Sequence, residues 1–369
     1  MRHSIAIFVK NLTSGGAEKQ AVSLARVLTL QYDVHFIVLN NQFTHQKYVD
    51  KIKEYSQIHY TAFSGSLIQR FFAFIEYLKK NKISLIFSYL TAANFFACLA
   101  KFFCKVKVCT GLRNAQLPFA KMVADRFLTN HCADFSVVNC FSGEKNFRIQ
   151  HFKSSKMVVI PNCYENISVW EEKKHVDIPK IIIVGRFVPQ KDYESAIHAI
   201  SMLKKIGIPF RFEIVGYGEQ EKDVRNWIDL YNISDVTEIK INPDNINALL
   251  QSADIYLSTS LFEGTSNSIM EAMNANLPII ATNVGDNSYL VKNDENGYLV
   301  SLGNLSQIAE KLGFLLKNEN VRRNMGQRSK KKLLNDFSTE KFFIRYENLI
   351  NSLLNGIKET EVQHPKTIS

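Results

Sequence analysis

Short apolar runs alternate with longer amphipathic segments along most of the chain. The runs are rich in β-branched side chains, which is typical of buried strands. The expected strands are 5–9, 34–39, 85–87, 106–110, 135–139, 158–162, 180–184, 212–216, 238–240, 255–257 and 279–282. The segments between them place apolar residues three or four apart, which predicts helices. The clearest of these are 17–30, 66–82, 92–103, 143–152, 246–252 and 337–354. This alternation predicts an α/β protein with parallel sheets.

The stretch 254–290 combines these elements with candidate chemistry. Its loop contains Glu263 and its helix contains Glu271, with seven residues between them. Ligands of parallel sheets bind at the carboxyl ends of the strands, where a carboxylate can accept hydrogen bonds from a sugar diol. Backbone amides of the loop suit a phosphate; the loop residues are Gly264, Thr265, Ser266 and Asn267. A simpler interpretation is that Ser268 and Glu271 only form a capping box.

A second candidate loop follows the apolar run 180–184. Gly185 would let the backbone approach a ligand closely. Arg186 and Lys191 place two cations on one strand-end loop, which suits a diphosphate. Asp192 can cap the helix that follows. Two unrelated surface cations are the alternative interpretation.

A third loop, after the strand at 212–216, contains Gly216 and Gly218. These glycines indicate a tight turn at another strand end. They do not form a dinucleotide-binding fingerprint, because Glu221 stands where the third glycine would be needed.

The first half of the chain offers two weaker candidates. Gly15, Gly16 and Glu18 follow the first strand, and the two glycines would permit close backbone approach, although an ordinary tight turn explains them equally. Arg113 and Asn114 stand where another strand should end. An arginine there can hold phosphate with two parallel donors; a salt-bridged surface arginine is the alternative.

The segment with Glu263 and Glu271 resembles the E-x7-E segment of the retaining GT-B glycosyltransferases of family four, the glycosyl transferases group 1. In that family the second glutamate binds the donor ribose and the first faces the donor sugar. The loop of Arg186 and Lys191 resembles the motif that holds the donor diphosphate, and Gly185 belongs to the same motif. Three further resemblances are the turn near the nucleotide (Gly216, Gly218), the loop that faces the cleft (Gly15, Gly16, Glu18) and a motif of members that build bacterial surface polysaccharides (Arg113, Asn114).

The resemblance implies an α/β protein of GT-B fold, with two Rossmann-like domains facing a central cleft. The implied parts are an acceptor-side domain, a linker, a nucleotide-sugar-binding domain, a helix that returns to the first domain and a disordered tail, at 1–164, 165–179, 180–336, 337–356 and 357–369. Two departures from the family touch loop geometry. Asn276 stands where the family usually has glycine, and Asp286 replaces a common second glycine after Gly285.

The implied activity is transfer of a sugar from a nucleotide-diphosphate donor, a UDP-sugar by family frequency, to a hydroxyl with retained configuration. The acceptor would be a glycan or a polyprenyl-linked sugar in polysaccharide biosynthesis, such as O-antigen or capsule. Glu263, Arg186 and Lys191 would be catalytic, with no metal and no cofactor, since the sequence contains no Asp-x-Asp motif. The alternatives are a nucleotide-sugar epimerase, a phosphorylase, or a non-catalytic partner that binds nucleotide sugars.

Composition and charge indicate where in the cell the protein acts. Residues 1–170 contain 21 Lys+Arg and 9 Asp+Glu, a balance of +12, whereas the remainder has a balance of −2. A basic first half favours an anionic partner, and basic and aromatic residues interleave within it, so we expect peripheral attachment to an anionic membrane and no nucleic acid. The alternative is that these aromatic residues belong to the core and the lysines only solvate a surface. The six cysteines form no C-x-x-C pair, which indicates reduced thiols in a cytoplasmic protein. The amino terminus lacks a signal-peptide core.

Overall fold

The computed structural model describes residues 2–13, 16–113, 118–165, 167–168 and 177–356. The chain divides into two compact units. The N-terminal domain comprises residues 1–165 and 339–369, and the C-terminal domain comprises residues 166–338. Most of the predicted linker and the predicted disordered tail, 357–369, lie outside the described residues.

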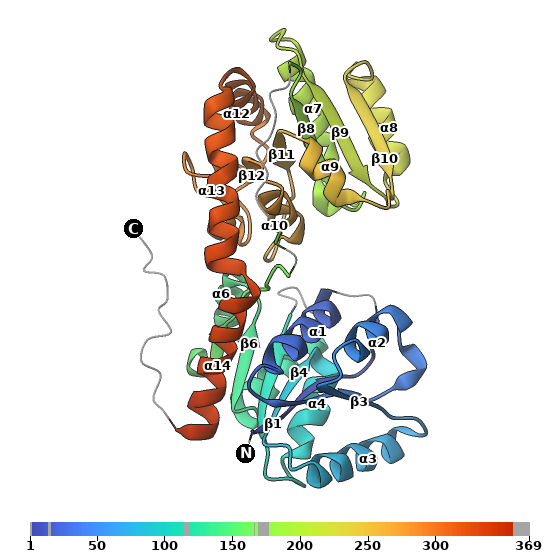
Figure 1. The fold of residues 1–369 in the computed structure, drawn as a ribbon. Helices are drawn as coiled ribbons and strands as arrows, with labels where there is room; N and C mark the ends of the chain where they lie inside the picture. The colour runs from blue at the N-terminus through green and yellow to red at the C-terminus, as the bar shows by residue number, and fades with distance from the viewer. Residues whose placement is uncertain (1, 14–15, 114–117, 166, 169–176, 357–369) are drawn as a thin grey trace. The chain divides into compact units, whose positions relative to one another are not determined.

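Among the described residues of the N-terminal domain, seven parallel strands form one sheet in the order β3-β2-β1-β4-β5-β6-β7 (Figure 1). The strands are β1 (Ser4–Val9), β2 (Asp33–Val38), β3 (Ile58–Ala62), β4 (Leu85–Tyr89), β5 (Lys107–Leu112), β6 (Phe135–Val138) and β7 (Met157–Val159). The helices are α1 (Gly16–Leu28), α2 (Gln46–Lys53), α3 (Leu67–Lys80), α4 (Thr91–Ala100), α5 (Phe119–Phe127), α6 (Phe141–Ile149) and α14 (Thr339–Asn355).

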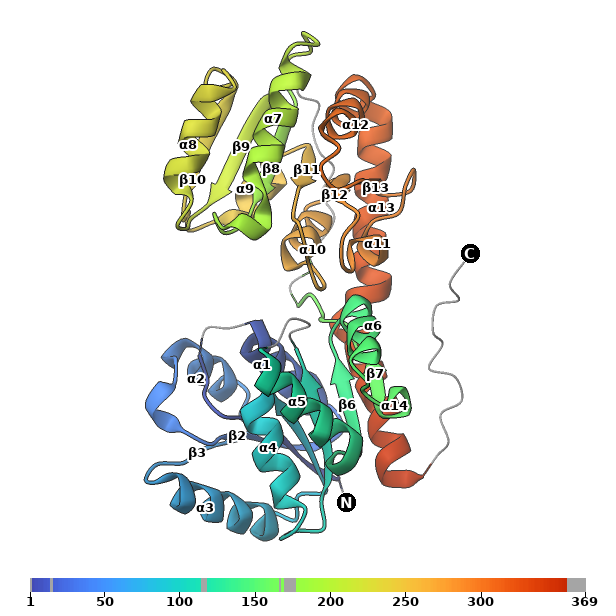
Figure 2. The same ribbon diagram turned by 180° about the vertical axis from the view of Figure 1, so that it is seen from behind.

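This sheet is covered on both faces, which explains why its strands are continuous apolar runs. Alternate residues of β1 enter different cores: Ile7 packs with α1 and α14, and Phe8 packs with α3 and α4. Figure 1 looks onto the α1 side of the sheet and Figure 2 onto the α4 side. Both cores are built from side chains that exclude water almost completely.

The C-terminal domain repeats the plan with a parallel sheet in the order β10-β9-β8-β11-β12-β13. The strands are β8 (Lys180–Val184), β9 (Arg211–Gly216), β10 (Thr237–Ile241), β11 (Ile255–Ser258), β12 (Ile279–Thr282) and β13 (Gly297–Val300). The helices are α7 (Tyr193–Lys204), α8 (Glu221–Leu230), α9 (Ile246–Ser252), α10 (Asn267–Asn274), α11 (Asn287–Leu290), α12 (Leu305–Lys317) and α13 (Glu319–Phe337). The α/β class predicted from the sequence is confirmed.

The final helix, α14, belongs to the N-terminal domain, although α13 before it belongs to the C-terminal domain. It packs on α1 and inserts Tyr346, which is 1% exposed. The Tyr346 ring meets Phe87 of β4 edge-on at 5.2 Å between centroids. Its hydroxyl accepts a hydrogen bond from Arg113 Nη2 at 3.1 Å. The chain therefore leaves this domain after Glu165 and re-enters it with the last helix.

Two local predictions need correction. The helix predicted at 143–152 is α6, but it starts at Phe141, with Cys140 as its N-cap, and ends at Ile149. The other difference is α13, a helix of 19 residues that the apolar pattern did not indicate. It buries Arg322, Ser329 and Lys330, so its inner face is not an apolar stripe.

No helix among the described residues combines the length and the apolar character that a membrane span requires.

Replacing Tyr346 by alanine should lower the free energy of unfolding of the N-terminal domain by about 3–5 kcal/mol, the usual cost of removing a large buried ring. Ile344→Ala on the same helix, where the side chain is 37% exposed, should cost less than about 1 kcal/mol. Urea unfolding of both variants measures the difference. Equal losses would contradict this account of how α14 is attached.

Candidate active site

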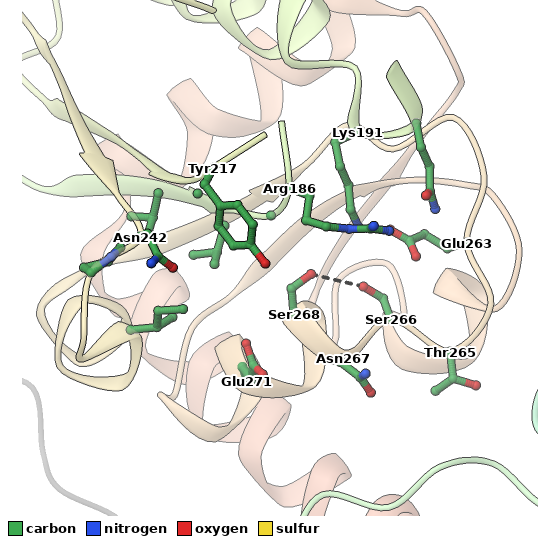
Figure 3. Close-up of a pocket in the computed structure, with 17 residues that line it drawn as sticks. Arg186, Lys191, Tyr217, Asn242, Glu263, Thr265, Ser266, Asn267, Ser268 and Glu271 are labelled. Carbon is green, nitrogen blue, oxygen red and sulfur yellow. Dashed lines mark hydrogen bonds and ion pairs between the residues drawn. The ribbon is translucent and has the colours of Figure 1, made fainter. Parts of the chain in front are cut away.

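A cavity of about 370 Å³ opens at the carboxyl ends of the strands in the C-terminal domain. That volume is in the range of small-molecule sites. The cavity is lined by Val184, Gly185, Arg186, Gln190, Lys191, Val215, Gly216, Tyr217, Asn242, Pro243, Ile246, Glu263, Thr265, Ser266, Asn267, Ser268 and Glu271. Figure 3 shows Tyr217, Asn242 and Glu271 toward one side, Lys191 and Glu263 toward the other, and Arg186 between them.

The loop after β8 is held by two buried tyrosines. Tyr193 donates its hydroxyl to the carbonyl of Gly185 at 2.8 Å, and Tyr256 donates to the carbonyl of Val184 at 3.2 Å. Burial raises the pKa of Tyr193 and of Tyr256, so both phenols keep the proton that they donate. The loop that presents Arg186 is thus fixed from beneath by neutral hydrogen bonds.

Lys191 and Glu263 form an ion pair in the cavity wall. Lys191 Nζ lies 2.5 Å from Glu263 Oε1, and the hydroxyl of Ser260 donates to the same oxygen at 2.8 Å. The Glu263 side chain is 9% exposed and that of Lys191 is 17% exposed. A carboxylate so enclosed needs such partners, because desolvation of an unpaired charge is costly. Arg186 is exposed, and no ion pair of Arg186 occurs within the described part of the chain.

The helix α10 begins at Asn267, with Ser266 as its N-cap. Ser268 therefore lies inside the helix, and the capping box that its spacing from Glu271 suggested does not form. The Ser266 and Ser268 hydroxyls lie 3.2 Å apart. The amino end of α10 faces the cavity together with Glu271 (Figure 3), which leaves that carboxylate in the lining instead of at a cap.

Sequence reasoning missed four polar residues of the lining: Gln190, Tyr217, Asn242 and Ser268. Tyr217 lies between the two predicted glycines and is 54% exposed. Asn242 directly follows β10, so its position at a strand end was an available signal. Gln190 donates its amide to the carbonyl of Phe262 at 2.8 Å, which ties the two predicted loops together.

Close packing explains three glycines around the cavity. A Cβ on Gly285, which has φ +54°, would lie 1.9 Å from the carbonyl oxygen of Glu263. A Cβ on Gly216 would lie 1.9 Å from the carbonyl oxygen of Gly185, and one on Gly218 would lie 2.5 Å from that of Phe187. These glycines let backbones meet, so they set the loop positions.

The structure brings most of the predicted donor residues into one cavity. Gly185, Arg186, Lys191, Gly216, Glu263, Thr265, Ser266, Asn267 and Glu271 line it, whereas Gly218 and Gly264 are not among the lining residues. The two departures from the family pattern are accommodated. Asn276 has φ +56°, a conformation that asparagine tolerates. Asp286 is buried and accepts a hydrogen bond from Thr265 Oγ1 at 3.4 Å.

The residues predicted in the first half lie at strand ends of the N-terminal domain. Gly16 opens α1, and Glu18 accepts a hydrogen bond from Thr13 at 2.8 Å. Gly15 and Asn114 lie outside the described residues.

Arg113 is not the salt-bridged surface arginine that we considered as the alternative. Its guanidinium donates to Tyr346 and, at 3.3 Å, to Asn162 Oδ1. It also lies 4.5 Å above the Tyr89 ring, an arrangement that attracts a cation. Arg113 therefore anchors α14.

Comparison with known proteins now adds to this geometry. Residues 164–332 match the family model described as glycosyl transferases group 1. The C-terminal domain belongs to the glycosyl transferases group 1. The matched range contains the whole cavity lining, from Val184 to Glu271.

Full-length similarity supports the same assignment. An uncharacterized glycosyltransferase of Haemophilus influenzae is 24% identical over 357 residues, which is 94% of this chain and 99% of that protein. The GalNAc-α-(1→4)-GalNAc-α-(1→3)-diNAcBac-PP-undecaprenol α-1,4-N-acetyl-D-galactosaminyltransferase of Campylobacter jejuni is 23% identical over 342 residues, 89% of this chain and 93% of that protein. The protein is a glycosyltransferase.

The crystal structure of Anabaena Alr3699/HepE in complex with UDP is similar in fold, with a TM-score of 0.79 and 15% identity. The similarity covers 95% of this chain and all of that one. The GT-B fold implied by the sequence motifs is thereby confirmed.

Gly285→Ala and Gly303→Ala form a matched pair that tests the packing of Glu263. Both positions have positive φ, +54° and +73°, but only Gly285 meets the Glu263 backbone, since nothing lies within 4 Å of a Cβ on Gly303. Backbone strain should lower the free energy of unfolding of each variant by about 1–2 kcal/mol. Displacement of Glu263 should lower turnover about 100-fold in G285A, and turnover in G303A should stay within about twofold. Similar turnover in the two variants would refute this reason for the glycine.

Proposed function

We propose that the protein transfers a sugar from a nucleotide-diphosphate donor to a hydroxyl with retention of anomeric configuration. The observation that carries the proposal is the Lys191–Glu263 ion pair beside Arg186 in one cavity. The two cations, Arg186 and Lys191, could stabilise negative charge in such a reaction, and the carboxylate of Glu263 could stabilise positive charge. Its transition state develops positive charge on the sugar ring and negative charge on the departing phosphate.

The diphosphate would lie against Arg186 and Lys191. Arginine can bind phosphate with two parallel donors and lysine binds it as a point charge. The backbone amides at the start of α10, in the segment 264–267, would add donors without charge. These groups would stabilise the leaving diphosphate without a proton transfer.

Glu263 would face the reacting sugar and Glu271 the donor ribose. The two carboxylates occupy different parts of the cavity (Figure 3), as a donor with a sugar at each end of its diphosphate requires. A bound diphosphate would compete with Glu263 for Lys191, so donor binding would release one carboxylate oxygen toward the sugar. Pre-placed charges of this kind lower the barrier because they need no reorganisation during reaction.

The donor base and the acceptor class are supported by relatives. The HepE crystal structure contains UDP, which supports a UDP-sugar donor. The Campylobacter jejuni relative is named for a PP-undecaprenol glycan, which supports a glycan or polyprenyl-linked acceptor in bacterial polysaccharide biosynthesis. Such an acceptor would place this enzyme peripherally on the cytoplasmic, anionic face of a membrane.

We propose that the reaction needs no metal, because Arg186 and Lys191 supply the positive charge that a divalent cation would otherwise bring to the diphosphate. A group of metal-ligating side chains within reach of one another does occur in the described part of the chain, at Asp33, His35 and His59. It belongs to the N-terminal domain and not to the cavity lining.

Arg186→Ala and Lys191→Ala should each lose about 1.5–3 kcal/mol of transition-state stabilisation, the range for hydrogen bonds to charged groups. Lys191→Ala should show the larger loss because it also leaves Glu263 without its ion-pair partner. Lys204→Ala, which breaks an ion pair with Asp235 remote from the cavity lining, is the control and should keep its turnover. Kinetics with a UDP-sugar and a glycan acceptor measure all three. Full turnover in both cavity variants would show that the diphosphate lies elsewhere.

Chelation provides an independent test. Turnover should be unchanged after dialysis against EDTA, because protein cations supply the charge. The control is a metal-dependent transferase treated in parallel. Loss of turnover that magnesium or manganese restores would reject metal independence while leaving the sugar-transfer assignment in place.

A further inference from the structure

A group of exposed apolar side chains lies on α3, on α4 and in the turn that follows α4. We call it the aromatic ledge; it consists of Ile68, Phe72, Phe95, Phe102 and Phe103, which are 43 to 81% exposed. Scattered apolar residues are normal on a surface, but a cluster of large ones marks an interaction site. Figure 1 shows α3 along the lower edge of the N-terminal domain, next to the lower end of α4.

Ring contacts hold the ledge in place. The rings of Phe72 and Phe103 lie 6.3 Å apart, and both contact buried Phe71, at 5.9 and 5.7 Å. Phe71 also contacts Phe96 at 5.9 Å, which in turn contacts Phe95 at 5.4 Å. Phe72 and Phe103 are therefore attached to the domain core through Phe71, and Phe95 is attached through Phe96, so these three rings need not be ordered when a partner binds.

The surroundings of the ledge are strongly basic. Residues 66–107 contain a single acidic residue, Glu76, and seven basic ones: Arg70, Lys79, Lys80, Lys82, Lys101, Lys105 and Lys107. Asp134 pairs with Lys101 and Lys107. The other four lysines are exposed and, within the part of the chain that the structure describes, make no ion pair.

These lysines gather at one edge of the sheet. Lys82 precedes β4 and Lys105 precedes β5, and the backbone N–H of Lys107 donates to the carbonyl of Ser84 at 2.9 Å, which places the two segments side by side. The Cys104 thiol donates to the Ile75 carbonyl at 3.9 Å, so the middle of α3 lies beside the turn after α4. The positive charge and the ledge therefore share one surface at the amino-terminal edge of the strands.

We propose that this surface docks on an anionic lipid bilayer. Exposed aromatic side chains can enter the headgroup layer while lysines bind anionic lipids. A second copy of the chain fits poorly, because a symmetric contact would bring two sets of unpaired lysines face to face. The proposal rests on the proposed function only in that a polyprenyl-linked acceptor would make attachment to its membrane useful.

The position of the surface bears on the acceptor. Ligands of parallel sheets bind at the carboxyl ends of the strands, and the ledge and lysines lie at the opposite edge. β5 has six residues, which span about 20 Å. An acceptor hydroxyl at the carboxyl edge would therefore stand roughly that far from the bilayer. Docking through the ledge favours acceptors that carry several sugars between the lipid and the reacting hydroxyl.

Co-sedimentation of the full chain with vesicles tests the docking surface. Vesicles of phosphatidylcholine with phosphatidylglycerol should pellet the protein at low salt, and vesicles of phosphatidylcholine alone should not. Two variants remove parts of the surface. One combines Phe72→Ser with Phe102→Ser, and the other combines Lys79→Gln, Lys80→Gln and Lys105→Gln. Each variant should lower the partition coefficient about tenfold or more.

Two controls remove side chains of the same kinds elsewhere in the same domain. Phe43→Ser removes an aromatic that is 58% exposed, against 55% for Phe72, and should leave binding within about twofold. Lys51→Gln with Lys53→Gln removes positive charge from α2 of the same domain. It should change binding less than the variant that replaces Lys79, Lys80 and Lys105. UDP binding by calorimetry and the unfolding temperature report whether each variant is intact.

Equal recovery in the supernatant with both kinds of vesicle would overturn the proposal. It would also be overturned if the phenylalanine variant and the lysine variant both bound vesicles as the wild type does. Either result together with intact UDP binding would leave the proposed function standing. If the wild-type chain did not bind UDP in the calorimeter, that result would instead count against the proposed function. If the phenylalanine variant misfolds, the lysine variant alone decides. A lipid-linked acceptor with one sugar should also react more slowly than one with several.

Discussion

The close approach of backbones at the carboxyl edge of the C-terminal sheet is the constraint on which the site depends. Gly285 packs against the carbonyl of Glu263, and Gly216 packs against the carbonyl of Gly185. A side chain at either glycine would separate loops that must touch. Gly216 therefore helps to place the β8 loop that contains Lys191, and Gly285 helps to place the loop that contains Glu263. These two loops are joined to each other by the amide of Gln190, which donates to the carbonyl of Phe262, and by the Lys191–Glu263 ion pair. Steric fit at two glycines therefore helps to position the charged groups of the cavity.

The hydrogen bonds beneath the cavity serve the same end. Tyr193 and Tyr256 satisfy carbonyls of the β8 loop from the core, and the Gln190 amide binds the loop that contains Glu263. Hydrogen bonds from these uncharged side chains thus hold the loops that contain the charged groups. Arg186 is the exception, because it is exposed. The cavity offers a ligand one enclosed ion pair, Lys191–Glu263, and one exposed cation, Arg186.

The sequence predicted the elements whose local pattern is strong. The strands β1, β8 and β11 are apolar runs, and the bounds of α9 match the predicted 246–252 because its ends carry clear signals. The helix α13 was not predicted, since polar residues interrupt its buried face: Arg322 donates to the carbonyl of Leu315 at 2.8 Å and Lys330 to that of Asn274 at 2.9 Å. Tertiary partners, which no local pattern contains, make that helix possible.

Site residues were predictable as types and not as partners. Lys191 and Glu263 are 72 positions apart, and each was named on its own motif, but only the fold shows that they pair. Arg113 was expected at a ligand edge, and the fold turns it toward Tyr346, which is 233 positions later. Motif spacing reports which chemistry a strand end carries. It does not report which strand end lies opposite, because that depends on sheet order.

The most direct test of the account is a titration of isotopically labelled protein with UDP, followed through backbone amide chemical shifts. The account places the nucleotide in the cavity of the C-terminal domain, so the largest shifts should fall on residues 185–191, on Tyr217 and on residues 263–271. Saturable shifts in those segments are the predicted result. Saturable shifts confined to other strand ends, or none at millimolar UDP, would contradict the central claim.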